Sequence, residues 1–190
     1  DLHPVCAGDR ALAESVLRNT KRMNDTVNNV LELPRRVPPA LESIDVSEWL
    51  SGVLKECKES HSKSATLSIK GKIDEPVIAD KNQMKRVLDN LIDNALRHSE
   101  VLTGDRTAAL EISRGTSPPQ CFIDVIDDGD GVPESSQPRL FEPFFTTSPE
   151  GTGLGLYLCK ELCESNGVDI HYRRTTDGRS SFRLSLRLQR

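Results

Sequence analysis

The chain has 190 residues, with 25 Lys or Arg, 29 Asp or Glu and a formal net charge of −4. This length is enough for one domain with its own core plus an appended helix. A slightly acidic chain lacks the basic field that nucleic-acid binding usually needs, so we expect no nucleic-acid partner. The sequence contains no apolar run of membrane-spanning length and no signal peptide, and we expect it to be soluble.

The first predicted element is a long helix over 9–33. Apolar or small residues recur there at alternating three- and four-residue spacing, as the seam of a helical bundle or coiled coil requires. These residues are Ala13, Val16, Thr20, Met23, Val27 and Val30. Prolines from Pro34 onward then end the helix. We therefore expect an N-terminal helical region at 1–34, a linker at 35–46 and a second domain at 47–190.

The second domain combines helical and strand patterns. We expect a helix over 47–60 with Ser47 as its N-cap. Its inward-facing residues are Trp49, Leu50, Val53 and Leu54. Six strands are expected, and the last two form a hairpin around the turn Asp177-Gly178. They lie near 65–70, 76–80, 108–113, 121–127, 168–172 and 181–188. The sum is an α+β fold, a mixed sheet with helices on one face.

A helix predicted at 85–99 carries two asparagines one turn apart, Asn90 and Asn94. At about 100° per residue they share one stripe with Arg97 and His98, opposite an apolar face. For one helix alone, a solvated polar face is the ordinary interpretation. Asn is a mediocre helix former, however, so two at mid-helix favour a functional role. Carboxamide oxygens suit Mg²⁺, which takes few protein ligands besides substrate phosphates, and Arg97 would then meet a phosphate oxygen.

The mostly apolar strand at 121–127 ends at Asp127, where a glycine-rich turn begins. A carboxylate at a strand end can accept a hydrogen bond from the exocyclic amine of adenine. Gly129 and Gly131 would let the backbone approach the ring, because no side chain intervenes. An ordinary turn aspartate that caps the loop is the alternative for Asp127.

A second glycine-rich segment opens the next predicted helix. It consists of Gly151, Thr152, Gly153, Leu154 and Gly155. The free amide groups and the positive dipole end of such a helix favour an anion, for which triphosphate is the natural candidate. The loop over 133–150 is expected to be a mobile lid, because few apolar residues lie between Pro133 and Arg139 and glycine follows at Gly151.

In this order the motifs resemble the N box, the first glycine box, the F box and the second glycine box of bacterial sensor histidine kinases. The corresponding segments are 90–97, 127–131, 140–147 and 151–156. The resemblance covers about residues 10–188. Two closing segments, 155–166 and 181–184, more specifically resemble the PilS-type sensors of type IV pilus two-component systems.

The resemblance implies a Bergerat-type (GHKL) ATP-binding fold, which is a two-layer α/β sandwich, preceded here by one long dimerisation helix. Residues 1–34 would be a partial dimerisation region without the acceptor helix, and 47–190 would be the catalytic ATP-binding domain. By the same resemblance, Asn94 is the magnesium ligand and Arg97 a basic catalytic residue near the phosphates. Asn90 is their neighbour in the nucleotide site. The other ATP-binding positions are Asp127 as the adenine-binding carboxylate, Gly129, Gly131, Phe145, Gly151, Thr152, Gly153, Leu154 and Gly155.

Some positions depart from the family pattern or have a second interpretation. Many relatives carry a lid Lys where this chain has Ser148, and a Tyr where it has His98. The three nearby aromatics Phe141, Phe144 and Phe145 would form the lid hinge, with plain core packing as the alternative.

The related ATPases, such as gyrase, MutL and the ninety-kilodalton heat-shock chaperones, have a Glu four residues before the metal Asn, where it activates water. That position is Asn90 here, and an amide cannot take a proton from water, so hydrolysis should be slow. In the family, the phosphoacceptor histidine lies in a short characteristic motif. None of the four histidines of this chain lies in such a motif; they are His3, His61, His98 and His171. We therefore expect a truncated sequence that lacks the phosphoacceptor.

Two functions stay open. The first is the catalytic part of a histidine autokinase, and the second is a module that holds ATP or ADP as a switch or scaffold without transferring phosphate. For the first, the resemblance implies ATP and Mg²⁺ as cofactors, a homodimer in the full-length kinase and a PilR-like response regulator as partner. It also implies the cytoplasmic portion of an inner-membrane sensor, which meets the membrane only through upstream segments.

Overall fold

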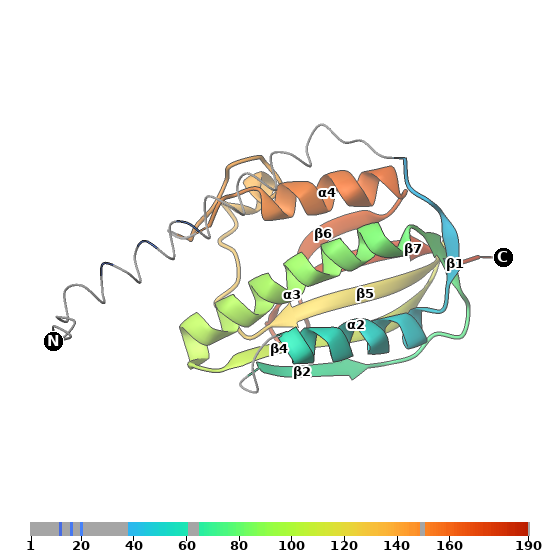
Figure 1. Cartoon of the computed structure of the whole chain (residues 1–190), viewed down its shortest axis with the longest axis horizontal. Coiled ribbons are helices and arrows are strands. Elements are labelled where there is room, and N and C mark those ends of the chain that lie inside the picture. Colours follow the sequence, from blue (N-terminus) through green and yellow to red (C-terminus); the bar gives the residue numbers. More distant parts are fainter. Residues whose placement is uncertain are drawn as a thin grey trace, which may run out of the picture.

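The computed structural model describes residues 38–60, 65–148 and 151–189, together with Leu12, Val16 and Thr20. These three single positions are helical and exposed. The rest of the helix predicted over 9–33 lies outside the described residues. The described chain forms two layers, in which a mixed sheet is covered on one face by three helices (Figure 1).

The main sheet has five strands in the order β2-β4-β5-β7-β6. These strands span Ala65–Lys70, Arg106–Thr116, Pro119–Asp127, Ser180–Arg187 and Asp169–Arg174. β2 pairs parallel with β4 and every other pair is antiparallel, so the predicted mixed sheet is confirmed. β6 and β7 form the predicted C-terminal hairpin. A separate antiparallel pair joins β1 (Glu42–Ile44), which the sequence reasoning missed, to β3 (Val77–Ala79).

The helices are α2 (Val46–Ser60), α3 (Lys81–Thr103) and α4 (Gly155–Ser165), and a short 3-10 turn η1 covers Gln137–Arg139. Their apolar faces and the inner face of the sheet form one core. The residues predicted to face inward from α2 are buried, namely Trp49, Leu50, Val53 and Leu54, and so is the apolar face of α3, namely Met84, Leu88, Leu91, Ile92 and Ala95. No helix in the described part of the chain is long and apolar enough to span a bilayer.

The predicted cap of α2 is wrong. The helix begins at Val46, one residue before Ser47, and Asp45 is the capping residue. Its Oδ1 accepts a hydrogen bond from the N–H of Glu48 at 2.9 Å, as an N-cap side chain does. The Ser47 hydroxyl instead donates to the carbonyl oxygen of Ile73 at 3.1 Å and so ties the helix to the segment before β3.

The long helix α3 is capped at both ends. Oδ1 of Asp80 accepts hydrogen bonds from the N–H groups of Asn82 and Gln83, both at 3.0 Å. Gly104 ends the helix in the left-handed conformation, with φ of 81°. The opposite, apolar face of α3 is buried in the core, and this burial orients the polar stripe near the middle of the helix.

Candidate functional site

Three of the predicted site residues form one row of hydrogen bonds on α3. The Arg97 guanidinium donates to Oδ1 of Asn94, and Nδ2 of Asn94 donates to Oδ1 of Asn90 at 3.3 Å. All three side chains are half-buried. The structure therefore brings Asn90, Asn94 and Arg97 together on one side of the helix, as the spacing predicted.

The amino-terminal turn of α4 lies against this row. A Cβ atom built on Gly155, the first residue of α4, would lie only 2.6 Å from Oδ1 of Asn90. A side chain at position 155 would therefore have to displace the carboxamide of Asn90. The preceding residue, Leu154, makes no side-chain cap because its side chain has no acceptor. The first amide groups of α4 are thus available to an anion beside Asn90.

The second glycine segment is hydrogen-bonded to the F-box segment. The N–H of Phe144 donates to the carbonyl oxygen of Gly153 at 2.9 Å. Gly153 has φ of 70°, and a Cβ atom there would lie 2.7 Å from Cα of Phe144. Phe144 itself has φ of 65° and an exposed side chain. The two segments therefore approach each other backbone to backbone.

Three other predicted ligand positions in this segment are partly engaged within the protein. Leu154 is fully buried, so only its backbone could face a ligand. Oγ1 of Thr152 accepts a hydrogen bond from the N–H of Leu154 at 3.3 Å. Gly151 lies against Thr146, because a Cβ atom on Gly151 would overlap Oγ1 of Thr146.

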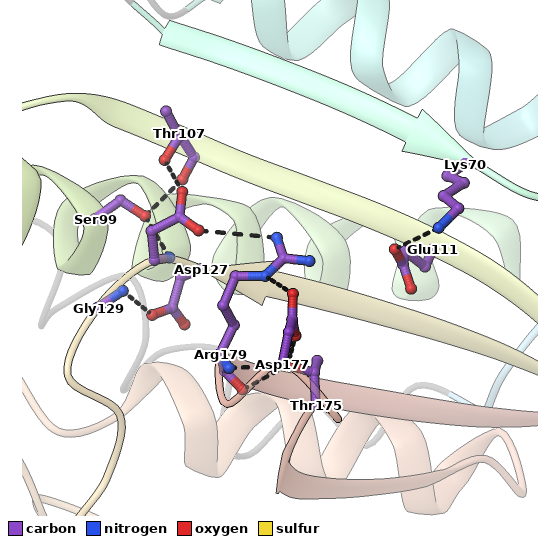
Figure 2. A network of polar contacts seen from close by, with 10 residues as sticks. Lys70, Ser99, Thr107, Glu111, Asp127, Gly129, Thr175, Asp177 and Arg179 are labelled. Atoms are coloured by element: carbon purple, nitrogen blue, oxygen red, sulfur yellow. Dashed lines mark hydrogen bonds and ion pairs between the residues drawn. The ribbon is translucent and has the colours of Figure 1, made fainter.

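Asp127 is buried at the end of β5. Its Oδ1 accepts from the N–H of Gly129 at 2.9 Å (Figure 2), and the hydroxyl of Ser180 also donates to the carboxylate. Burial raises the pKa of Asp127, although these two hydrogen bonds and nearby His98 partly offset the effect. Ser180 was not predicted as a site residue, because only the register of β5 with β7 places it opposite Asp127.

The adjacent Asp128 has a different set of partners. Its Oδ2 accepts from Oγ1 of Thr107 at 2.7 Å, and its N–H donates to Oγ of Ser99 at 3.0 Å. Arg179 lies 3.8 Å from Oδ1 of Asp128. In Figure 2 Ser99, Thr107 and Arg179 take part in contacts separate from the Asp127–Gly129 pair. Asp128 is therefore structural, which leaves Asp127 as the candidate for base recognition.

His98 lies beside the same turn. A Cβ atom on Gly129 would be 3.1 Å from Cβ of His98, and the charge of Asp127 acts on the imidazole. Withdrawal from water lowers the pKa of His98, while Asp127 raises it and Arg97 lowers it.

The first glycine turn is held from β6 by two residues that sequence reasoning missed. Nη2 of Arg174 donates to the carbonyl oxygen of Asp130 at 2.5 Å, and the N–H of Val132 donates to the Tyr172 hydroxyl at 2.9 Å. A Cβ atom on Gly131 would lie 2.6 Å from that hydroxyl. Alternation along β6 puts Tyr172 and Arg174 on one face, but no local pattern shows that this face meets the turn.

The F-box aromatics divide between the core and the surface. The Phe141 ring packs edge-on against Phe182, with centroids 6.3 Å apart. Phe145 is half-buried against the core, and the Arg139 guanidinium lies 4.6 Å from its ring centroid. Core packing thus accounts for Phe141 and Phe145, whereas Phe144 is 67% exposed.

The assembled site is elongated. Asn90, beside α4, and His98, beside the Asp127 turn, are eight residues apart on α3, or about 12 Å along the helix. One end offers a buried acceptor and the other a helix amino terminus. No group of three or more His, Cys, Asp or Glu that could hold a metal occurs among the described residues. The carboxamides of Asn90 and Asn94 fit Mg²⁺, which needs few protein ligands when phosphates supply others.

Comparison with known proteins agrees with this geometry. The chain belongs to the histidine kinase-, DNA gyrase B-, and HSP90-like ATPase family, whose model matches residues 79–190. It is 39% identical to the sensor protein kinase PilS of Pseudomonas aeruginosa over 94% of this chain and 34% of PilS. It is 30% identical to the sensor histidine kinase GtrS of the same organism over 96% of this chain and 36% of GtrS. The chain thus spans about a third of these curated relatives.

Two solved structures share the fold. The first is full-length ShkA in complex with AMPPNP, with a TM-score of 0.74 and 21% identity over 97% of this chain and 40% of that one. The second is the catalytic domain of the histidine kinase ThkA, with a TM-score of 0.63 and 25% identity over 77% of this chain and 94% of that one. The predicted α+β ATP-binding fold and the likeness to PilS-type histidine kinases are confirmed.

Proposed function

We propose that residues 47–190 are the catalytic domain of a sensor histidine kinase, which transfers the γ-phosphate of Mg-ATP to a histidine on a dimerisation helix. The observation that carries this proposal is the row of Asn90, Asn94 and Arg97. It runs between the open amino terminus of α4 and the turn that holds the buried Asp127. The row thus lies between two chemically different ends, one suited to a base and the other to phosphates, as a nucleoside triphosphate requires.

Each group has a distinct role in this proposal. Asp127 accepts a hydrogen bond from the adenine amine, and Ser180 and Gly129 keep its carboxylate in place. The first turn of α4 receives the phosphates through its amide groups and dipole. Asn94, with Asn90 beside it, would hold Mg²⁺, which when bound neutralises phosphate charge. A fixed nucleotide then presents its terminal phosphate to an incoming imidazole.

Transfer is favoured over hydrolysis by the side chain at position 90. Asn90 already accepts a hydrogen bond from Asn94, and a carboxamide cannot remove a proton from water near neutral pH. The domain therefore has no general base at this position, and ATP persists until a stronger nucleophile arrives.

The 39% identity to PilS supports a narrower proposal. The phosphate would pass from the acceptor histidine to a PilR-like response regulator that controls transcription of type IV pilus genes. The complete kinase would be a homodimer held at the inner membrane by upstream segments. The catalytic domain would lie in the cytoplasm.

The test is to mix the chain with ATP labelled at the γ-phosphate and a separately supplied PilS-type hairpin that carries the acceptor histidine. Phosphohistidine should form on the hairpin, and Asn94→Ala should abolish it. Asn82→Ala is the matched control, because Asn82 is an exposed asparagine in the first turn of the same helix. Tight ATP binding without any phosphohistidine would favour the alternative function, a nucleotide-binding switch or scaffold.

A further inference from the structure

The oxygen proposed to bind magnesium already has a cationic partner. The Arg97 guanidinium donates to Oδ1 of Asn94, while Nδ2 of Asn94 donates to Oδ1 of Asn90. The two bonds run in one direction along α3 and fix how both amides are turned. The positive charge of Arg97 is therefore held by a neutral carboxamide on the helix face that meets the open end of α4.

A guanidinium and a divalent cation cannot both contact Oδ1 of Asn94 without a large electrostatic cost. Both would lie within a few ångströms of Oδ1, and like charges at that separation repel strongly in a half-buried site. Mg²⁺ can use Oδ1 of Asn94 only after Arg97 has moved. Phosphate oxygens are the group that can accept the guanidinium, because they offer charge-assisted bonds stronger than the bond to a neutral amide.

We propose that Arg97 is a latch on the metal ligand, an inference that rests on the proposed function. Without nucleotide, Arg97 occupies Oδ1 of Asn94 and keeps a divalent cation away. When the phosphates enter, Arg97 transfers to them and frees the oxygen. Arg97 is thus a positioning residue that makes metal binding follow nucleotide binding, in addition to being a phosphate contact.

If Arg97 acts as a latch, substitutions of Asn94 and of Arg97 should change the affinity for ADP in opposite directions in metal-free solution. Asn94→Ala removes the competing acceptor and frees Arg97 for phosphate, so ADP should bind about fivefold more tightly in the presence of chelator. Arg97→Ala removes the phosphate contact, so ADP should bind about tenfold more weakly. The double variant should match Arg97→Ala, because the amide acts only through the guanidinium.

The factor by which Mg²⁺ strengthens ADP binding gives a second readout. That factor should disappear in Asn94→Ala and should increase in Arg97→Ala, since no guanidinium on the phosphates then repels the metal. Lys81→Ala removes one positive charge from the exposed first residue of α3 and should change neither quantity. Calorimetric titration with ADP, with chelator and with Mg²⁺, measures all the variants, and circular dichroism melting verifies that each is folded.

The outcomes separate the two proposals. If wild-type protein binds no ADP under either condition, the proposed function and the latch both fail. If Mg²⁺ strengthens wild-type binding but Asn94→Ala leaves metal-free affinity unchanged, the site is correct and the latch is wrong. A smaller magnesium factor in Arg97→Ala would also overturn the latch.

Discussion

The backbone N–H of Asp80 donates to Oδ1 of Asn166 at 2.7 Å, which joins the start of α3 to the residue that follows α4. Nδ2 of Asn166 donates to Oε1 of Gln83 at 2.8 Å, and the Asp80 carboxylate also accepts from the N–H of Ala40 at 2.8 Å. Asp80 and Asn166 are both buried. This contact fixes how the two helices of the candidate site lie against each other and attaches the segment before β1 to both.

The contact predicts a large effect for a small truncation. Asn166→Ala leaves the buried N–H of Asp80 without its acceptor, and we expect it to lower the free energy of unfolding by about 2 kcal/mol. Urea denaturation followed by circular dichroism measures this. Ser165→Ala is the control, since its exposed hydroxyl bonds should cost less than about 0.5 kcal/mol. Equal losses from the two variants would contradict the assigned role.

Asp80 predicts a loss of stability in acid. Burial alone would raise its pKa, but N–H groups of Gln83, Ala40 and Asn82 donate to the carboxylate and lower the pKa overall. A lowered folded pKa means that the stabilisation is present above the unfolded value of about 3.9 and is lost as pH falls through the folded value. Wild-type stability should therefore fall more steeply than that of Asp80→Asn below about pH 4. Parallel curves from urea denaturation at each pH would show that the carboxylate adds nothing.

Asp127 predicts base selectivity. Asp127→Asn replaces the charged acceptor by a neutral amide, and ATP should lose about 1.5–3 kcal/mol of binding free energy while GTP loses little. Calorimetric titration with both nucleotides measures the difference. Asp128→Asn is a matched control, because that carboxylate contacts Thr107 and should not change the ratio. Equal losses for ATP and GTP in Asp127→Asn would mean that Asp127 does not recognise the base.

We predict that the close backbone contact between Gly153 and Phe144, which joins the second glycine segment to the F-box segment, is needed for nucleotide binding. Gly153→Ala adds backbone strain and also drives Cβ to 2.7 Å from Cα of Phe144, so ATP affinity should fall about tenfold or more. Gly178→Ala separates the two causes, because φ is 86° there but no atom lies within 4 Å. That control should cost about 1–2 kcal/mol of stability and leave ATP affinity unchanged. Unchanged ATP affinity in Gly153→Ala would show that the contact between Gly153 and Phe144 is not needed for nucleotide binding.

Much of the fold follows from local patterns. The strands β2 and β5, the apolar face of α3 and the hairpin turn near Gly178 were predictable, because alternation, helical periodicity and turn residues act over a few positions. The cap of α2 was misassigned, since Asp45 and Ser47 are both good capping residues and only the true start at Val46 separates them. β1 was missed because three residues carry too little periodicity to identify a strand.

The site residues also divide into those that local sequence patterns predicted and those that only the tertiary structure brought together. Spacing on one helix determined that Asn90, Asn94 and Arg97 share a stripe, because helical geometry is local. Tertiary structure decided what surrounds that stripe. Sheet register placed Ser180 opposite Asp127, and helix packing brought Gly155 against Asn90, through contacts between residues more than fifty positions apart. The sequence by itself specifies which faces are apolar and where turns occur, whereas the partners of each polar group depend on which faces pack together.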